Sequence, residues 1–156
     1  MLKINIIVLG KNKDQWVADA IAHYLKLLKK YATVSFSYIP GKKLSDKLSD
    51  VEAMKLEADL IRKRLISRYQ IALSEHGSTF TSEQFAGIMS NILKESGGAC
   101  DFVIGGIYGL DKSFIKSCHR VLSLSPMTMS HQIVRPVFLE QLYRGFSILA
   151  GGKYHR

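Results

Sequence analysis

Cysteine is scarce in this sequence: only Cys100 and Cys118 occur, and each stands alone among apolar residues. Cysteine-based zinc sites and disulfide frameworks need cysteines in pairs or at short, regular spacings. The sequence therefore excludes both kinds of site. We predict that the two thiols are reduced core residues without a catalytic role.

Long hydrophobic runs are also absent. The apolar run nearest to the start, Ile4–Leu9, is far shorter than the ~20 apolar residues that cross a bilayer. Lys3 alone does not provide the charged head of a signal peptide. We therefore expect a cytoplasmic protein that does not enter a membrane.

Acidic residues are few, with 13 Asp and Glu against 22 Lys and Arg, which gives a formal net charge of +9. Residues 1–70 carry most of this excess, with fourteen basic against seven acidic residues. A positive field of this kind favours a polyanion such as RNA or DNA as a partner. Solubility alone would also account for it.

The length and composition predict one folded domain spanning residues 1–156. A chain of 156 residues is close to the commonest domain size and is too short to divide comfortably into two. Its 47% hydrophobic and 22% charged residues match an ordinary globular protein.

Short β-branched runs alternate with longer amphipathic stretches, which predicts an α/β fold with a mostly parallel sheet flanked by helices. The predicted strands are Leu2–Leu9, Thr33–Ile39, Tyr69–Leu73, Cys100–Ile104 and Val121–Ser125. The predicted helices cover about Asp14–Tyr31, Asp50–Ser67 and Thr81–Ser96, a short segment after Asp111, and His131–Ala150. Because Cys100–Ile104 is apolar apart from Asp101, we expect it at the centre of the sheet.

Local signals refine the helices. Apolar residues at helical spacing predict the buried faces of the first two, which are Trp16, Ala20, Tyr24, Leu27 and Leu28, and then Met54, Leu56, Ala58, Ile61 and Leu65. The run from Thr81 to Gln84 predicts a capping box, and Gly97 with Gly98 ends that helix. Pro136 is expected in the first turn of the last helix.

Three segments qualify as parts of a ligand site, because ligands bind beyond the carboxyl ends of strands in open parallel sheets. They are Leu73–Gly77, Gly105–Leu110 and Leu124–Met129, each rich in Gly, Ser or Thr. The glycine segment lacks both the dinucleotide fingerprint and the Lys-Ser/Thr pair of a phosphate loop. A nucleotide held through its phosphates is therefore not expected, and a plain tight turn would also account for the glycines.

The C-terminal end also carries reactive side chains. Tyr154, His155 and Arg156 place an aromatic ring, an imidazole and a guanidinium on a mobile terminus, where they could stack on a base, exchange a proton and hold a phosphate. Glu140 and Arg144 are spaced as an i,i+4 ion pair. A purely structural role remains open for this pair and for the tail.

Several motifs, taken in order, resemble the RlmH family, which contains large-subunit ribosomal RNA pseudouridine methyltransferases of the SPOUT superfamily. They are Phe102-Val-Ile-Gly-Gly-x-x-Gly-Leu110, Leu122-Ser-Leu-Ser-x-Met-Thr128, His131-Gln-x-x-Arg135, Glu140-Gln-x-Tyr-Arg144 and the terminal Tyr-His-Arg. The resemblance covers essentially the whole chain, including the opening strand and its Gly-Lys-x-Lys.

The resemblance implies a C-terminal trefoil knot, a homodimer with sites near the interface, and S-adenosylmethionine (SAM) as the methyl donor, without a metal. The implied donor contacts are Leu73, Gly105, Leu124, Ser125, Pro126, Met127, Thr128 and Met129. The implied substrate is the N(3) position of a pseudouridine in 23S rRNA. Because the chain has no appended RNA-binding domain, we expect recognition of the assembled 70S ribosome or large subunit.

The implied reaction is an attack by a ring imide nitrogen on the sulfonium methyl group, after the nitrogen has lost its proton. We hypothesise that His155 assists proton removal or orients the base and that Tyr154 stacks on it. Arg156 and Arg144 would hold a phosphate or carbonyl oxygen. Two alternatives remain at this point: a noncatalytic RNA-binding or ribosome-assembly protein, and a methyltransferase of the same superfamily that acts on tRNA.

Overall fold

The computed structural model describes residues 1–40 and 47–155, and the part of the predicted basic loop at 41–46 lies outside them. Its strands are β1 (Leu2–Leu9), β2 (Ala32–Ile39), β3 (Gln70–Ser78), β4 (Ala99–Ile104) and β5 (Arg120–Leu122). Its helices are α1 (Gln15–Leu28), α2 (Asp50–Arg62), α3 (Ser82–Glu95), α4 (Lys112–Ser117) and α5 (Val134–Leu149).

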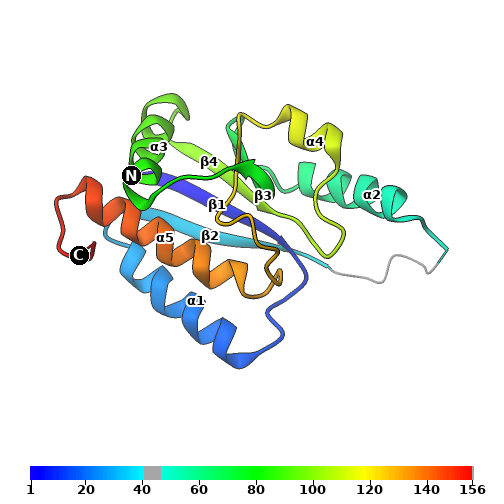
Figure 1. Cartoon of the computed structure of the whole chain (residues 1–156), viewed down its shortest axis with the longest axis horizontal. Coiled ribbons are helices and arrows are strands. Elements are labelled where there is room, and N and C mark those ends of the chain that lie inside the picture. The colour runs from blue at the N-terminus through cyan, green and yellow to red at the C-terminus, as the bar shows by residue number, and fades with distance from the viewer. Residues whose placement is uncertain (41–46, 156) are drawn as a thin grey trace.

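The strands form one parallel sheet in the order β2-β1-β4-β3-β5 (Figure 1). This confirms the predicted α/β class and the central position of β4. Alternate residues of the strands face two core clusters. One holds Ile6 and Phe102 with residues of α1, α3 and α5, and the other holds Ile7 and Val103 with residues of α2 and α4. Helices therefore cover both faces of the sheet.

Asp101, the polar residue of the central strand β4, has hydrogen-bond donors for both of its carboxylate oxygens. Asp101 is buried and pairs in register with Asn5, whose amide donates to its carboxylate at 2.7 Å. The carboxylate also accepts from the backbone N–H groups of Ile66 and Ser67, at 3.1 and 2.9 Å. These two N–H groups are therefore drawn away from a helix, which is why α2 ends at Arg62 and not at Ser67 as predicted.

Two predicted buried faces were partly wrong. Trp16 is 54% exposed and Leu56 is 43% exposed. The core side of α1 is formed by Val17, Ile21 and Leu28. Leu28 was predicted, whereas Val17 and Ile21 lie one position after the predicted residues Trp16 and Ala20.

The ends of β3 and β5 also differ from prediction. Leu73–Gly77 was predicted to be a loop after the strand, but β3 continues to Ser78, which pairs with Leu122 across a register shift. A Cβ on Gly77 would lie 2.7 Å from the Leu122 carbonyl carbon, so the two strands approach more closely than any side chain allows. β5 ends at Leu122, and the residues up to Ser125 form a loop.

The helix boundaries otherwise follow their local signals. Thr81 and Gln84 form the predicted capping box, and Asp111 caps α4 through the Phe114 N–H group. The last helix begins at Val134, three residues later than predicted, and Pro136 lies in its first turn as expected. Among the described residues, no helix has the length and apolar character needed to span a bilayer.

Candidate functional site

A cavity of about 680 Å³ lies at the carboxyl edge of the sheet, against the second half of β3 and beyond the ends of β4 and β5. All three segments selected from the sequence contribute to its wall. Of the eight predicted donor contacts, Leu73, Gly105, Leu124, Ser125, Met127, Thr128 and Met129 line it, whereas Pro126 does not. The fold therefore brings together at one site residues that are up to 56 positions apart, from Leu73 to Met129.

The glycine segment Gly105–Leu110 forms part of the cavity wall, and three of its six residues have no side chain. A Cβ on Gly105 would lie 2.9 Å from the carbonyl carbon of Gly109 and 3.0 Å from Leu110 Cγ. The Gly109 N–H donates to the Gly106 carbonyl at 3.0 Å, and Gly109 has a φ of +80°, which favours glycine. Glycine at 105 and 109 therefore allows the segment to pack tightly on itself at the cavity wall.

The loop after β5 is held by its own serines and by β3. The Ser123 hydroxyl donates to the Ser125 carbonyl at 2.8 Å, and the Met127 N–H donates to the Ser125 hydroxyl at 3.0 Å. The Thr128 hydroxyl donates to the Glu75 carboxylate at 2.6 Å. This hydrogen bond joins two of the segments that line the cavity.

Glu75 and His76 line the cavity within the selected segment Leu73–Gly77, although neither was named as a ligand contact. Lys112 and His131 also line it and lie outside all three selected segments. Partial burial, followed by the positive charges of Arg135 and Lys13, lowers the pKa of His131. Its imidazole is therefore neutral at pH 7 and offers one donor and one acceptor to a ligand. The signal that could have revealed it is its position just before the last helix, at the same edge of the sheet.

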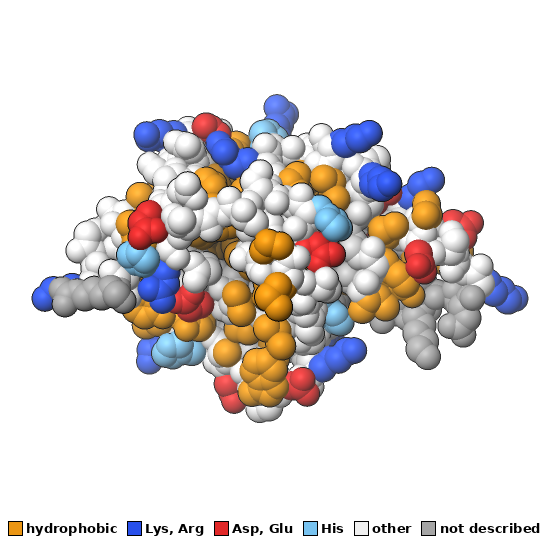
Figure 2. Space-filling model, in the orientation of Figure 1, with side chains coloured by type: hydrophobic (Ala, Val, Ile, Leu, Met, Phe, Trp, Pro, Cys, Tyr) orange, Lys and Arg blue, Asp and Glu red, His pale blue; other side chains and the backbone are white. Residues whose placement is uncertain are grey.

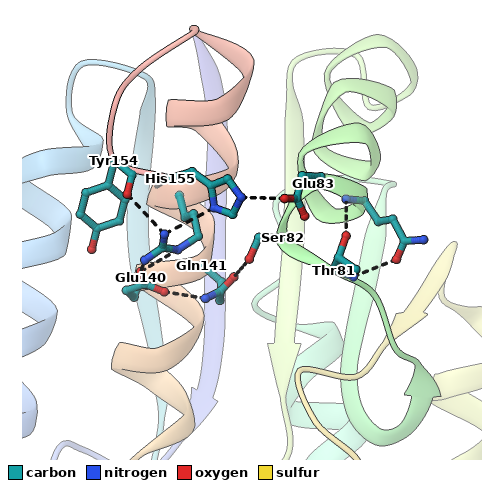
Figure 3. A network of polar contacts seen from close by, with 9 residues as sticks. Thr81, Ser82, Glu83, Glu140, Gln141, Tyr154 and His155 are labelled. Atoms are coloured by element: carbon teal, nitrogen blue, oxygen red, sulfur yellow. Dashed lines mark hydrogen bonds and ion pairs between the residues drawn. The ribbon is translucent and has the colours of Figure 1, made fainter.

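The C-terminal residues form a second polar site, at the other end of α5 (Figure 3). Arg144 donates to Glu140 Oε1 at 2.5 and 3.0 Å, which confirms the predicted i,i+4 pair. Its Nη1 also donates to the Tyr154 carbonyl at 3.3 Å, and its guanidinium lies 4.6 Å from the centre of the Tyr154 ring. His155 Nε2 lies 2.7 Å from Glu83 Oε1, which ties the tail to α3.

The terminus was predicted to be mobile, but these contacts hold both Tyr154 and His155 against the body of the protein. Burial, followed by the proximity of Tyr24, raises the pKa of Tyr154, so its hydroxyl stays protonated at neutral pH. The predicted site residue Arg156 lies outside the described residues.

Within one chain, the tail does not reach the cavity. Val134 lines the cavity, whereas Arg144 lies ten positions further along α5, a rise of about 15 Å. In Figure 1 the red segment that follows α5 lies beyond the far end of that helix. The structure therefore brings the predicted donor contacts together but leaves Arg144, Tyr154 and His155 apart from them.

An apolar groove of about 290 Å³ runs between α1 and α5, lined by Trp16, Tyr24, Ile133, Pro136, Val137 and Glu140. Trp16, Ile133 and Val137 are all exposed. Apolar side chains are visible over this part of the molecule in Figure 2. The groove lies along α5, between the cavity at one end of the helix and the tail at the other.

Neither cysteine lies in the cavity or the tail site. Burial raises the pKa of Cys100 to about 12 and that of Cys118 to about 11, so both thiols stay protonated at neutral pH. Over residues 1–40 and 47–155, no group of three or more His, Cys, Asp or Glu side chains is placed to hold a metal ion.

A parallel α/β sheet with a cavity at its carboxyl edge defines a ligand-binding protein of the open α/β class. Solved structures share this fold. A Bordetella pertussis protein described as "Probable Methyltransferase" matches over 93% of this chain and 93% of its own, with a TM-score of 0.54 and 14% identity. A Legionella pneumophila protein described as a "putative methyltransferase", solved with the bound cofactor SAM, matches with a TM-score of 0.51 and 11% identity over 97% of this chain and 67% of its own.

Sequence comparison identifies the family. The family model described as "Predicted SPOUT methyltransferase" matches residues 2–155. Proteins named "Ribosomal RNA large subunit methyltransferase H" are similar over their whole length: one from Streptococcus equi subsp. zooepidemicus is 36% identical over 99% of this chain, and one from Nitratiruptor is 39% identical over all of it. The chain belongs to the SPOUT methyltransferase family, and it is a methyltransferase.

Proposed function

We propose that the cavity at the carboxyl edge of the sheet binds SAM and that this enzyme methylates N(3) of a pseudouridine in 23S rRNA. The observation that carries the proposal is the convergence of three strand-end segments on one cavity. The family membership and the names of the relatives give the substrate class.

The residues of the cavity fit this cofactor. A volume of about 680 Å³ lies within the range of small-molecule sites. Leu73, Gly105 and Leu124 offer apolar surface and exposed backbone to the adenosine, and the polar loop 125–129 offers hydroxyls and main-chain groups. The Glu75 carboxylate provides negative charge at a site for a cation.

When bound, SAM supplies an electrophilic methyl group. The protein must then place the imide nitrogen in line with that methyl and remove its proton. In the proposal His155 assists proton removal or orients the base, and the Tyr154 ring stacks on it. Arg144 and Arg156 hold a phosphate or carbonyl oxygen.

These tail residues can act only if a second copy of the chain supplies them, since Arg144 lies about 15 Å along α5 from the cavity in the same chain. The proposed enzyme is therefore a homodimer. The exposed groove with Trp16, Ile133 and Val137 provides an apolar surface for the interface. A two-fold axis through the middle of α5 would place the tail of one protomer beside the cavity of its partner.

The wider setting of the reaction follows from the size of the enzyme. One domain spanning residues 1–156 offers little surface for reading an RNA sequence, so the proposed substrate is the assembled 70S ribosome or large subunit, recognised by its shape in the cytoplasm. The fold is proposed to carry the C-terminal trefoil knot of the superfamily.

Two measurements test the proposed function. Calorimetry with SAM should show one site per chain, and mass spectrometry of rRNA from cells lacking the protein should show one unmethylated pseudouridine. A noncatalytic RNA-binding protein would bind ribosomes without binding SAM. Loss of a methyl group from tRNA, with rRNA unchanged, would assign the enzyme to a different substrate.

A further inference from the structure

Arg135 is a buried cation without an acidic partner among the described residues. Its side chain is 1% exposed, in the first turn of α5. Its guanidinium donates to the Leu9 carbonyl at 2.8 Å, to Asn12 Oδ1 at 3.0 Å and to the His131 carbonyl at 2.9 Å. Since all three acceptors are neutral, its positive charge is not cancelled by a contact.

Gln132 is also buried, and its side chain binds backbone groups of the segment 9–13 that follows β1. Its Nε2 donates to the Lys11 carbonyl at 3.1 Å, and its Oε1 accepts from the Lys13 N–H at 3.1 Å. Together, Arg135 and Gln132 make four hydrogen bonds to residues 9–13. The start of α5 therefore fixes the conformation of the turn that follows β1.

The consequence is that two lysines are held next to Gln132, the sequence neighbour of the cavity-lining residue His131. Lys11 and Lys13 are both exposed, although their backbone is held on both sides of Asn12. Lys13 is close enough to His131, which lines the cavity, to act on its titration. Lys11, Lys13 and the buried charge of Arg135 thus add to one positive field beside the candidate site.

We propose that Lys11 and Lys13, held in place by Gln132 and Arg135, form a phosphate-binding rim that receives the RNA backbone next to the cavity. This inference rests on the proposed function, because it assigns a contact to the same substrate. Lysine ammonium groups suit a backbone phosphate as point charges, and phosphate contacts set the register in which a base is presented. Gln132 and Arg135 are positioning residues, since they act through the segment that they hold.

The rim is tested by binding to purified bacterial 70S ribosomes at several KCl concentrations. The double variant Lys11→Gln and Lys13→Gln should weaken binding at least about tenfold at low salt, and it should reduce the slope of log K against log salt by roughly 1.5 to 2. Its affinity for SAM should not change.

A matched control is the double variant Lys3→Gln and Lys94→Gln, which removes the same charge. Both residues are exposed and lie at the amino edge of the sheet, at the start of β1 and in the last turn of α3. The control should keep the slope of the unaltered protein. If the slope of log K against log salt falls equally in both double variants, the effect comes from net charge alone and the proposed phosphate-binding rim is overturned.

The positioning role is tested by Gln132→Ala, which keeps both lysines. We expect a several-fold higher KM for ribosomes with kcat little changed, because the rim is present but no longer fixed. An unchanged KM would overturn the role of Gln132. Failure of the unaltered protein to bind SAM would instead refute the proposed function, so the two failures are distinguishable.

Discussion

The carboxylate of Glu75 accepts a hydrogen bond from the Thr128 hydroxyl at 2.6 Å, which joins the extended end of β3 to the loop after β5. Both residues line the cavity. The contact therefore fixes a negative charge in the wall of a site proposed for a sulfonium compound. It also sets the distance between two of the three segments that form the site.

Replacing Glu75 by Gln should weaken SAM binding about tenfold, because the substitution removes a charge while keeping a hydrogen-bond acceptor for Thr128. Calorimetry with SAM and with its uncharged product S-adenosylhomocysteine measures the effect. The loss should be larger for SAM. An equal loss for both compounds would mean that Glu75 acts by shape and not by charge. The control is Asp19→Asn, which removes the same charge from an exposed position of α1 outside the cavity lining and should leave SAM binding unchanged.

Replacing Gly105 by Ala should abolish or strongly weaken SAM binding. The new Cβ would meet the Gly109 backbone at 2.9 Å, so the glycine segment must move into the cavity or away from it. We expect a cost of about 1–3 kcal/mol in the free energy of unfolding as well. The matched control is Gly87→Ala in α3, where a Cβ meets nothing within 4 Å.

That control should keep full SAM affinity and gain up to ~1 kcal/mol in stability from helix propensity. Denaturant unfolding and calorimetry on the two variants measure both quantities. Normal SAM affinity in Gly105→Ala would contradict the assignment of this loop to the donor site.

The elements that were predictable from sequence depend on short-range signals. The capping box of Thr81 and Gln84, the cap at Asp111 and the strand-end glycines each depend on residues a few positions apart, and the structure confirms them. The candidate donor contacts were found through the resemblance and through the rule that ligands bind at the carboxyl edge of a parallel sheet.

The features of the fold that the sequence did not predict depend on contacts between residues that are far apart in the chain. Asp101 ends α2 early by binding Ile66 and Ser67, and this contact spans 35 positions. The continuation of β3 depends on pairing with Leu122. Trp16 was expected in the core because its hydrophobicity suits burial, but Val17 and Ile21 face the sheet. The spacing of apolar residues shows that a helix has an apolar face, but it does not show to within one residue which positions point at the sheet.

His131 should titrate below the ordinary value for histidine, and Lys13→Gln should raise its pKa by removing a nearby positive charge. Because the folded-state pKa is lowered, the unfolded chain binds more protons between the two values. The stability linked to His131 is therefore fully present above pH ~6.5 and is lost as the pH falls through the folded-state pKa.

The variant His131→Gln should remove this component of the pH dependence of unfolding. NMR titration of the imidazole gives the pKa, and denaturant unfolding between about pH 5 and 8 gives the stability. An unchanged pKa in Lys13→Gln would mean that Lys13 and His131 lie further apart in solution than in this structure.

The separation of tail and cavity along α5 makes a specific prediction for mixed dimers. One subunit lacks residues 154–156, and the other carries Gly105→Ala; each should be inactive as a homodimer. In a mixed dimer the intact cavity of the first subunit faces the intact tail of the second. Random mixing should therefore restore roughly a quarter of the normal activity per subunit, since half of the dimers are mixed and each has one complete site.

Methyl transfer to 70S ribosomes is the readout, with the two subunits carrying different affinity tags so that the mixed dimer is purified and its stoichiometry checked. The matched control mixes Gly105→Ala with a subunit that carries both defects, which leaves every site incomplete and should restore nothing. Full activity of the tail-truncated homodimer would remove Tyr154, His155 and Arg156 from the reaction. No activity in the purified mixed dimer would show that the tail acts only on its own chain, as a structural tie through Glu83 and Arg144.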